Sequence, residues 1–462
     1  MTQTPAPLPT TANPAAATPT AASPRPPRRH PADLPFHFPG RDLAETLATE
    51  RGEPEWLRAE RVAAWTAYDA LPIEANQLYT PYIDLRAAVL DEVRPYVLDG
   101  PPGLGDDLRA LRAAGLPKGV HVETMGEWLE RDPEGFRAVL EGGGTLPATD
   151  KLAQLARGFW SHGRHVQVDA GTKLDQPVVL RWPSASPGRA LITRTVVTLG
   201  KGASASVVEE LVPCGPDIDC AEGQAVPQGF FHGTTEVLLG EGATLAMASI
   251  QDFGPGQVAF QHRHATIGEG ATLHWALAQL GGRVVRSRVD NRLEGDRSSV
   301  EQVEIVFAAD DQLFDLTSYT RHLGRDTTGN LLSKGALLDR SKSFLKGMIT
   351  IEKSAVGTDS YLGEFGMNLS RAARAVAIPS LEIDQPDCRR AAHASSVGPI
   401  DETQQFYLES RGIPRDEARK FIVLGFLEPV VARVPLESAR DRLRDLLDAK
   451  WAAGTAEAAS AA

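Results

Sequence analysis

A six-residue glycine motif recurs in the middle of the chain, and it limits what this chain can fold into. Leu-Gly-Lys-Gly-Ala-Ser at 199–204 returns as Leu-Gly-Glu-Gly-Ala-Thr at 239–244 and as Ile-Gly-Glu-Gly-Ala-Thr at 267–272, with a degraded copy near 293–295. Glycine permits a tight corner, and the small residues after it fit the inside of a coil whose neighbouring rungs leave little room. The repeat favours a stacked parallel β-helix over a β-sandwich, in which the same glycines would close hairpins.

The segments on either side of the repeat have the spacing of helices. Before it, Val62, Trp65 and Tyr68 lie three residues apart on one face, and Pro72 ends the pattern. After it, Asp401 begins a capping box, and further apolar helical patterns follow. We therefore expect a mainly β protein with flanking α segments, in the order helix, β-helix, helix.

The 462 residues are enough for several domains. We expect a disordered Pro/Ala-rich tail at 1–38, an N-terminal helical domain at 39–163, the β-helix core at 164–384, a C-terminal helical domain at 385–452 and a disordered tail at 453–462. An organelle transit peptide at the start is less favoured, because the dense prolines prevent an amphipathic helix. Without a spanning apolar run or a signal-peptide core, we expect a soluble cytoplasmic protein, with a plastid location less favoured.

Charge and cysteine content exclude several classes of function. The chain has 60 acidic and 48 basic residues, a net charge of −12, which argues against nucleic acid or an anionic membrane as a partner. The three cysteines, Cys214, Cys220 and Cys388, form no C-x-x-C pair and no even-numbered disulfide framework. They are also too few to bind a four-cysteine iron-sulfur cluster within this chain alone.

Two pairs of residues in the central region are weak candidates for metal ligands. His262 and His264 would lie on the same face of a strand, but no carboxylate or thiol lies beside them in sequence, which favours two polar side chains on a solvent face. Cys214 and Cys220 lie in a loop at an offset that is not a recurrent metal spacing, which favours two ordinary loop thiols. No phosphate-binding glycine loop opens a helix, so a nucleotide-binding domain is not predicted.

A carbohydrate-active β-helix enzyme is a possible alternative from another class. Such an enzyme would need paired carboxylates on the coil, and Asp310 with Asp311 or Glu301 with Glu304 could supply them. Acidic pairs at strand ends are usually solvated, so this alternative is disfavoured.

The segment 381–414 is the strongest candidate site. It places Cys388, His393 and several acidic residues where the strand pattern gives way to helices. A thiolate, an imidazole and carboxylates within a few residues can bind iron or the edge of a cluster. Spacing alone still favours a structural role for His393.

The same segment resembles the C-terminal signature of the SufB/SufD family of iron-sulfur cluster assembly scaffolds. The family signature runs from P-x-L-E-I through H-G-A-T-V-G to F-Y-L-x-S-R-G-I, and this chain has Pro-Ser-Leu-Glu-Ile at 379–383, His-Ala-Ser-Ser-Val-Gly at 393–398 and Phe-Tyr-Leu-Glu-Ser-Arg-Gly-Ile at 406–413. Weaker similarity extends over about residues 40–450. Ala394 stands where SufB-like members have an acidic residue, and the chain has few cysteines, so it is more similar to the SufD branch.

The resemblance implies a right-handed parallel β-helix and a scaffold that is not itself an enzyme. It implies a SufB-like partner bound through the β-helix and a SufC-like ATPase bound through the C-terminal helices, with ATP entering only through that partner. The resemblance does not decide whether the isolated chain forms a homodimer. The helix residues that we expect to contact the ATPase are Phe406, Tyr407, Arg411, Phe421 and Phe426.

His393 matches the signature histidine, which implies a transient iron or iron-sulfur cluster shared with the SufB-like partner. The family often has cysteine two residues before this histidine, where this chain has Ala391, and Cys388 is the nearest thiol. Cys388 is therefore a second candidate ligand. A purely architectural subunit, with all the chemistry on the partner, is the alternative within the same family.

Overall fold

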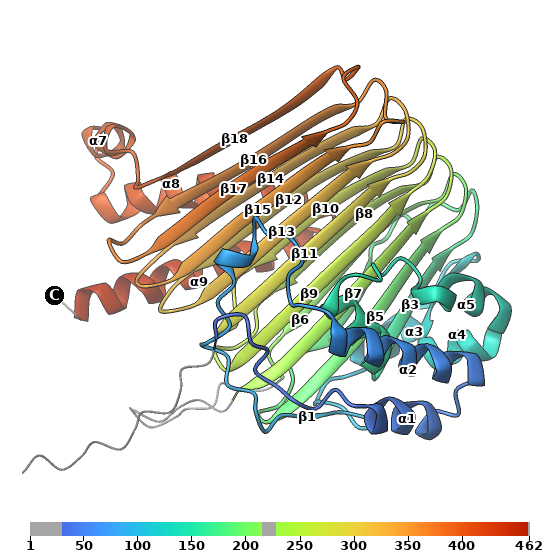
Figure 1. Ribbon diagram of the computed structural model, residues 1–462. Coiled ribbons are helices and arrows are strands. Elements are labelled where there is room, and N and C mark those ends of the chain that lie inside the picture. The colour runs from blue at the N-terminus through green and yellow to red at the C-terminus, as the bar shows by residue number, and fades with distance from the viewer. Residues whose placement is uncertain (1–29, 215–227, 461–462) are drawn as a thin grey trace, which may run out of the picture.

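Successive strands alternate between two facing sheets in the computed structural model, which describes residues 30–214 and 228–460, the last six as backbone only (Figure 1). Within each sheet the β-helix strands pair in parallel, each with the strand two places along the chain. A chain that alternates in this way between two parallel sheets is a solenoid. The prediction of a parallel β-helix is confirmed, and the hairpin sandwich is wrong.

Sheet A consists of β2 (Val120–Thr124), β3 (His162–Val168), β5 (Arg189–Leu199), β7 (Gly229–Leu239), β9 (Gln257–Ile267), β11 (Val284–Leu293), β13 (Leu313–His322), β15 (Lys342–Ile351) and β17 (Arg374–Ile383), and β1 (Arg94–Pro95) pairs with β5. Sheet B consists of β4 (Val178–Pro183), β6 (Ser204–Val212), β8 (Thr244–Gln251), β10 (Thr272–Gln279), β12 (Ser299–Ala308), β14 (Thr328–Leu337), β16 (Asp359–Asn368) and β18 (Arg390–Gly398).

The N-terminal helices are α1 (Arg41–Glu50), α2 (Glu55–Ala70), α3 (Asp106–Ala114), α4 (Met125–Arg131), α5 (Pro133–Leu140) and α6 (Lys151–Phe159), with short 3-10 helices η1 (Thr80–Tyr82) and η2 (Glu141–Gly143). The C-terminal helices are α7 (Glu402–Ser410), α8 (Arg415–Val431) and α9 (Glu437–Ser460). No helix in the described part of the chain is long and apolar enough to span a membrane.

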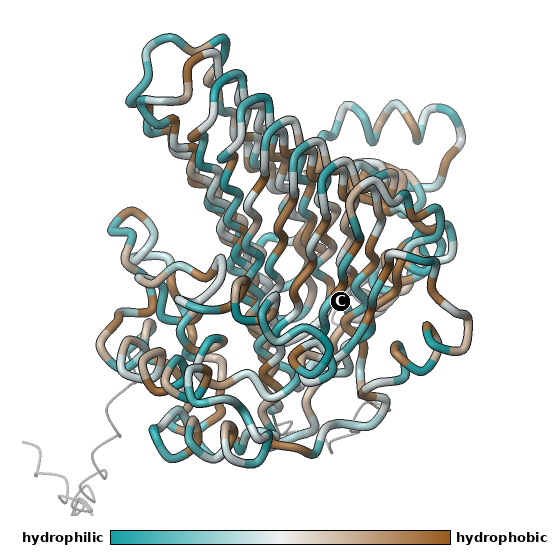
Figure 2. Tube along the Cα trace, turned by 90° about the vertical axis from the view of Figure 1, so that its right-hand side faces the viewer, coloured by the Kyte–Doolittle hydropathy of each residue, from teal (hydrophilic) through white to brown (hydrophobic). Residues whose placement is uncertain are grey.

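The repeated glycine motif forms one corner of successive coils. Gly202, Gly242 and Gly270 have φ angles of 66°, 65° and 61°, a region of the backbone map that favours glycine. The alanine after each of these glycines is fully buried. Two later coils have Arg297 and Asp326 in the same left-handed conformation, with φ of 58° and 54°. The same left-handed corner is therefore present in later coils that lack the glycine motif. Hydrophobic residues recur along the strands, and the corners are mostly hydrophilic (Figure 2).

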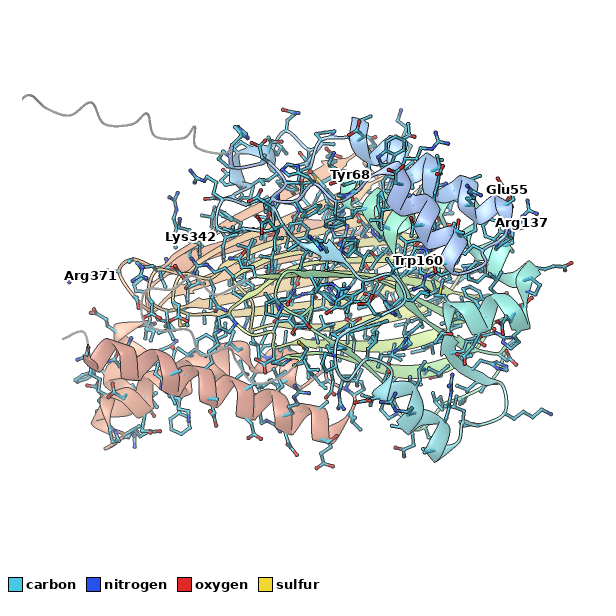
Figure 3. The ribbon with its side chains drawn as sticks, turned by 90° about the horizontal axis from the view of Figure 1, so that it is seen from below. Glu55, Tyr68, Arg137, Trp160, Lys342 and Arg371 are labelled. Atoms are coloured by element: carbon cyan, nitrogen blue, oxygen red, sulfur yellow. The ribbon has the colours of Figure 1, made fainter. Side chains whose placement is uncertain are left out.

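The N-terminal helices other than α3 cover the outer face of sheet A, and the C-terminal helices lie on the opposite side of the solenoid (Figure 3). Residues 30–38 belong to the first of these layers, because Phe36 is buried with its ring 4.7 Å from that of Phe230. The prediction of a disordered tail is therefore wrong for these residues, since two phenylalanines supply apolar surface to bury. Residues 1–29 lie outside the described part of the chain.

Two further predicted boundaries differ from the structure. The sheets extend past residue 384 by one strand, β18, which the sequence placed in the helical domain. Val397 is its one β-branched residue, and the Ala, Ser and Gly residues around it are not typical of a strand. Helix α9 continues to Ser460, through most of the tail predicted as disordered at 453–462. The alanines there are strong helix formers.

The N-terminal end of the solenoid is closed by a cap. Strand β2 pairs antiparallel with β3 at the end of sheet A, and α4 and α5 follow it directly. Trp128 of α4 is 2% exposed and stacks on His165 of β3, with 3.5 Å between the ring centroids. Arg164 of β3 donates two hydrogen bonds, of 3.0 and 2.9 Å, to Asp107 of α3.

Candidate functional site

The C-terminal end of the solenoid is open. Strands β17 and β18 are the last of sheets A and B, and neither has a neighbour on its outer edge among the described residues. Side chains that would be buried between the sheets in an inner coil are therefore exposed. Ile383 of β17 is 45% exposed and Val397 of β18 is 40% exposed. An unpaired strand edge beside exposed apolar side chains is a template for another chain.

His393 lies on the inward face of this last coil. It pairs in register with Leu362 of β16, whose fully buried side chain packs in the core. Because side chains alternate along a strand, His393 faces the same side as Leu362, toward the space between the sheets. No further coil covers it, so the imidazole is exposed. A fold that buries equivalent side chains in every earlier coil presents this one to solvent.

Cys388 lies in the connection between β17 and β18, in the same coil as His393. Its half-buried side chain packs against the small core formed by Leu331, Ile349, Ile351, Ala355 and Leu362. Among the described residues, no group of three or more His, Cys, Asp or Glu side chains is placed to hold a metal ion. One imidazole and one thiol from this chain are an incomplete ligand set, which a second chain would have to complete.

Glu364 lies one position further along β16 on the same inward face and was not predicted from the sequence. It is 1% exposed, and its carboxylate accepts a hydrogen bond of 2.8 Å from the backbone N–H of Ile378. Burial raises the pKa of Glu364 to about 8, against the opposing effects of that hydrogen bond and of the Lys346 charge. Its position between Gly363 and Phe365 in the sequence gives no signal, because only the strand register reveals its neighbours.

Helices α7 and α8 place three of the predicted ATPase contacts in solvent. Phe406 is 70% exposed, Tyr407 56% and Phe421 62%. The guanidinium of Arg411 lies 5.2 Å from the centre of the Tyr407 ring. Three large aromatic side chains on two consecutive helices are therefore exposed to solvent.

Phe426, the fifth predicted contact, differs from the other four. It is half-buried against the core between α8 and sheet B, with Lys334 Nζ 4.6 Å from the centre of its ring. Lys334 also donates a hydrogen bond of 3.0 Å to the Phe426 carbonyl. Phe426 therefore attaches α8 to the solenoid.

The other candidate metal ligands are not on a solvent face. His262 is 1% exposed and His264 2% exposed, because the N-terminal region covers the outer face of sheet A where they lie. Burial is the main cause that lowers the pKa of His262 well below its usual value, with further lowering by nearby histidines and arginines. Cys214 is a half-buried free thiol, and Cys220 lies outside the described residues.

The carboxylates of the carbohydrate-enzyme alternative do not form a catalytic pair. Glu304 is fully buried between the sheets and accepts a hydrogen bond of 2.8 Å from Ser287. Glu301 lies on the opposite, outer face of the same strand, 3.5 Å from His274. Asp311 is in an ion pair with Arg283 at a corner, next to Asp310.

Comparisons with known proteins give one consistent result. A family profile described as the SUF system FeS cluster assembly, SufBD core domain, matches residues 182–426. An iron-sulfur cluster assembly SufBD family protein of Mycobacterium tuberculosis is 31% identical over 344 residues, which cover 72% of this chain and 81% of the relative. The iron-sulfur cluster assembly protein SufD of Bacillus subtilis is 27% identical over 301 residues, or 65% of this chain and 67% of the relative.

Proposed function

The chain belongs to the SufBD family of the SUF system for iron-sulfur cluster assembly, and from this premise we propose that it is the SufD-type subunit of a cytoplasmic scaffold complex. A SufB-type chain would pair with its open end, and a SufC-type ATPase would bind its C-terminal helices. The observation that carries the proposal is the open last coil, where an unpaired strand edge lies beside an exposed histidine. The chain itself would serve as a scaffold and not as an enzyme.

His393 would receive iron or the edge of a nascent cluster as cargo. Neutral imidazole is a good ligand for ferrous iron, and thiolates from the partner would complete the set. Cys388 lies in the same coil and is the one described thiol near it. The incomplete ligand set of this chain supports a site that forms only when two chains meet.

The attachment of α8 suggests how ATP hydrolysis on the partner would reach this site. Helix α8 packs across β10, β12 and β14, and Arg419 donates a hydrogen bond of 3.3 Å to the carbonyl of Leu369, just after β16. Strand β16 is in turn paired with β18, which carries His393. A motion of the ATPase at α7 and α8 would therefore act on the strands of the open end, coupling the two sites.

Replacement of His393 tests the cargo site. The complex of His393→Ala with its SufB-type and SufC-type partners should assemble normally and contain severalfold less iron or cluster, measured by metal analysis and absorbance. Ser395→Ala, two residues along on the same face of β18, is the matched control and should leave the cluster content unchanged. Unchanged cluster content in His393→Ala would support a purely architectural subunit instead.

Point variants on the exposed aromatic residues test ATPase docking. The double variant Phe406→Ser and Phe421→Ser should weaken binding of the SufC-type partner at least about tenfold, without lowering the free energy of unfolding. Val89→Ser changes an exposed apolar residue in the N-terminal region and is the control. Retained ATPase binding by the double variant would contradict the docking proposal. Deleting the helices is a poorer test, because Val423, Leu427 and Leu443 bury the outer face of sheet B.

A further inference from the structure

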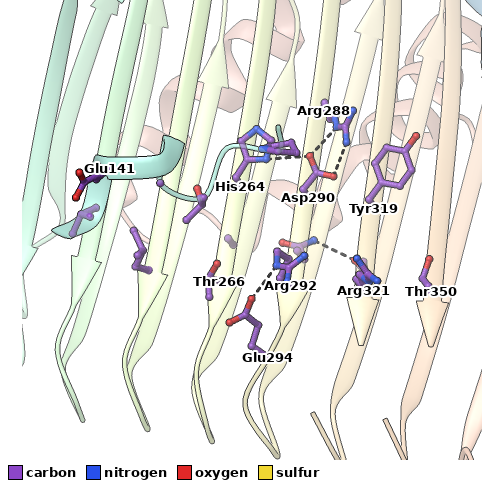
Figure 4. Close-up of a pocket in the computed structure, with 18 of the residues that line it drawn as sticks. Glu141, His264, Thr266, Arg288, Asp290, Arg292, Glu294, Tyr319, Arg321 and Thr350 are labelled. Carbon is purple, nitrogen blue, oxygen red and sulfur yellow. Dashed lines mark hydrogen bonds and ion pairs between the residues drawn. The ribbon is translucent and has the colours of Figure 1, made fainter. Parts of the chain in front are cut away.

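A cavity of about 680 Å³ lies on the outer face of sheet A, between the loop after α5 and strands β7 to β15 (Figure 4). Its floor is formed by two rows of side chains that run across neighbouring strands in strict register. The first row contains His264, Asp290 and Tyr319, and the second contains Leu238, Thr266, Arg292, Arg321 and Thr350. The loop after α5 covers the floor with Gly144, Thr145 and Pro147.

Two arginines lie directly opposite each other in the second row. Arg292 of β11 pairs in register with Arg321 of β13, and Thr266 and Thr350 flank them on the next strands (Figure 4). Like charges at directly opposed positions of a sheet destabilise it. Glu294 and Glu352 offset part of that repulsion, and an anion between the two guanidinium groups would offset more of it.

Each guanidinium group binds a glutamate along the edge that carries Nε, so N–H donors on its other side can bind a ligand. Arg292 donates from Nε to Glu294 over 2.9 Å, and Arg321 donates from Nε to Glu352 over 2.6 Å. Neither terminal nitrogen of Arg292 has a hydrogen-bond partner within the described residues. A tetrahedral phosphate has enough oxygens to accept from both arginines, whereas the two oxygens of a carboxylate suit a single guanidinium.

The first row contains the buried imidazole of His264, one nitrogen of which has no hydrogen-bond partner among the described residues. His264 is 2% exposed, and its Nδ1 lies 3.1 Å from Asp290 Oδ2. Burial would raise the pKa of Asp290, but the Arg288 charge and the hydrogen bond from His264 hold it well below its usual value. The ionised carboxylate keeps the proton on Nδ1, so Nε2 is an acceptor. Nε2 has no partner in the part of the chain that the structure describes, and an orphaned buried atom calls for one.

The spacing between the rows fits an organic ring. His264 and Thr266 are two residues apart in one strand, so their rows are about 7 Å apart. Val139, Pro147 and Leu238 provide apolar surface beside that gap. A ring could therefore lie against these three residues, with an N–H or O–H directed at His264 and a phosphate at the arginines.

We propose that this cavity binds a ring-bearing phosphate monoester, the size of a mononucleotide or smaller. Arg292 and Arg321 bind the phosphate, Val139, Pro147 and Leu238 contact the ring, and His264 Nε2 accepts a hydrogen bond from it. The site is separate from the cluster assembly role proposed for His393 and does not depend on it.

Calorimetric titration of the full chain tests the proposal. AMP and 4-nitrophenyl phosphate are the probes, and adenosine and 4-nitrophenol are the same rings without phosphate. At least one phosphate should bind, and the double variant Arg292→Gln and Arg321→Gln should weaken its binding at least about tenfold. Arg297→Gln is the matched control, because Arg297 is an exposed arginine paired with Glu269 outside the cavity.

A second variant tests the position of the ring. Val139→Trp places a large side chain in the cavity while leaving both arginines in place, and it should also weaken phosphate binding at least about tenfold. The proposal is overturned if neither phosphate binds the native chain, if the double arginine variant binds as tightly as the native chain, or if the phosphate-free rings bind as tightly as the phosphates.

Discussion

The two ends of the solenoid are built in opposite ways. At the N-terminal end, β2 reverses the strand direction, and α4 covers the first coil with the buried ring of Trp128. At the C-terminal end, β18 finishes with a free edge, and Val397 lies 40% exposed on it. Stacked repeats need caps at their ends to stay soluble and to avoid pairing with other chains. A chain that caps one end only leaves the other end free to pair, and we propose that a SufB-type chain takes the place of the missing coil.

Truncating one side chain at each end of the solenoid is the strongest test of this comparison. Trp128→Ala should lower the free energy of unfolding by about 4 kcal/mol, because it removes a buried ring and leaves a cavity at the cap. Val397→Ala at the open end should cost below about 1 kcal/mol. Denaturant unfolding measures both values. Equal losses would show that the open end is packed as tightly as the cap.

The buried carboxyl of Glu364 should make the open end sensitive to pH. Its pKa is about 8 in the folded chain and 4.5 for an ordinary glutamate, so the folded state binds the proton more tightly. Its contribution to stability is complete below pH 4.5 and is lost as the pH rises through about 8.

Glu364→Gln cannot ionise, and at about pH 9 it should be more stable than the native chain by about 3 kcal/mol. Unfolding measured between about pH 5 and pH 9 checks this difference. A stability difference that does not change with pH would contradict the burial of a protonated carboxyl there.

A charge on the free edge should affect binding more than folding. Val397→Lys places a cation on the exposed inward face of β18, and it should weaken binding of a SufB-type partner at least about tenfold while changing the unfolding free energy little. Leu98→Lys is the control, because Leu98 is 57% exposed in the N-terminal region. If both variants bind the partner as the native chain does, the partner uses another surface.

The cap should show the opposite and smaller pH dependence. Burial would raise the pKa of Glu123, but hydrogen bonds from His165 and Arg131 lower it to about 2. Its contribution is therefore present above pH 4.5 and is lost as the pH falls through about 2. Glu123→Gln should cost about 1 kcal/mol at neutral pH, because the pair is partly solvated, and less in acid. Hydrogen exchange of β2 and β3 would report the loss, and a cost that grows in acid would contradict it.

The sequence predicted the β-helix because its determinants are local. A left-handed corner favours glycine, and the motif around Gly202, Gly242 and Gly270 is a local sign of such corners. Strand β18 was missed for the same reason, since its small residues carry no local strand signal. The C-terminal signature singled out His393, but its inward direction follows only from the pairing with Leu362.

Contacts between distant segments could not be predicted in this way. His262 and His264 alternate with their neighbours as solvent-facing residues would, yet the N-terminal region covers that face of sheet A. The opposed pair of Arg292 and Arg321 is separated by a full coil in sequence, and only the register brings the two together. Motif spacing describes one strand at a time, whereas both of these features arise between strands.

The strict register of the parallel strands also makes the length of this protein adjustable in whole steps. Thr272 of β10 pairs with Ser299 of β12, and Ser299 pairs with Thr328 of β14, so each coil repeats the same positions of the one before it. Duplicating residues 299–327 would insert one complete coil and move the open end about 4.8 Å further from the cap. In such a series of lengthened chains, the number of coils would set the distance between the two ends of the solenoid.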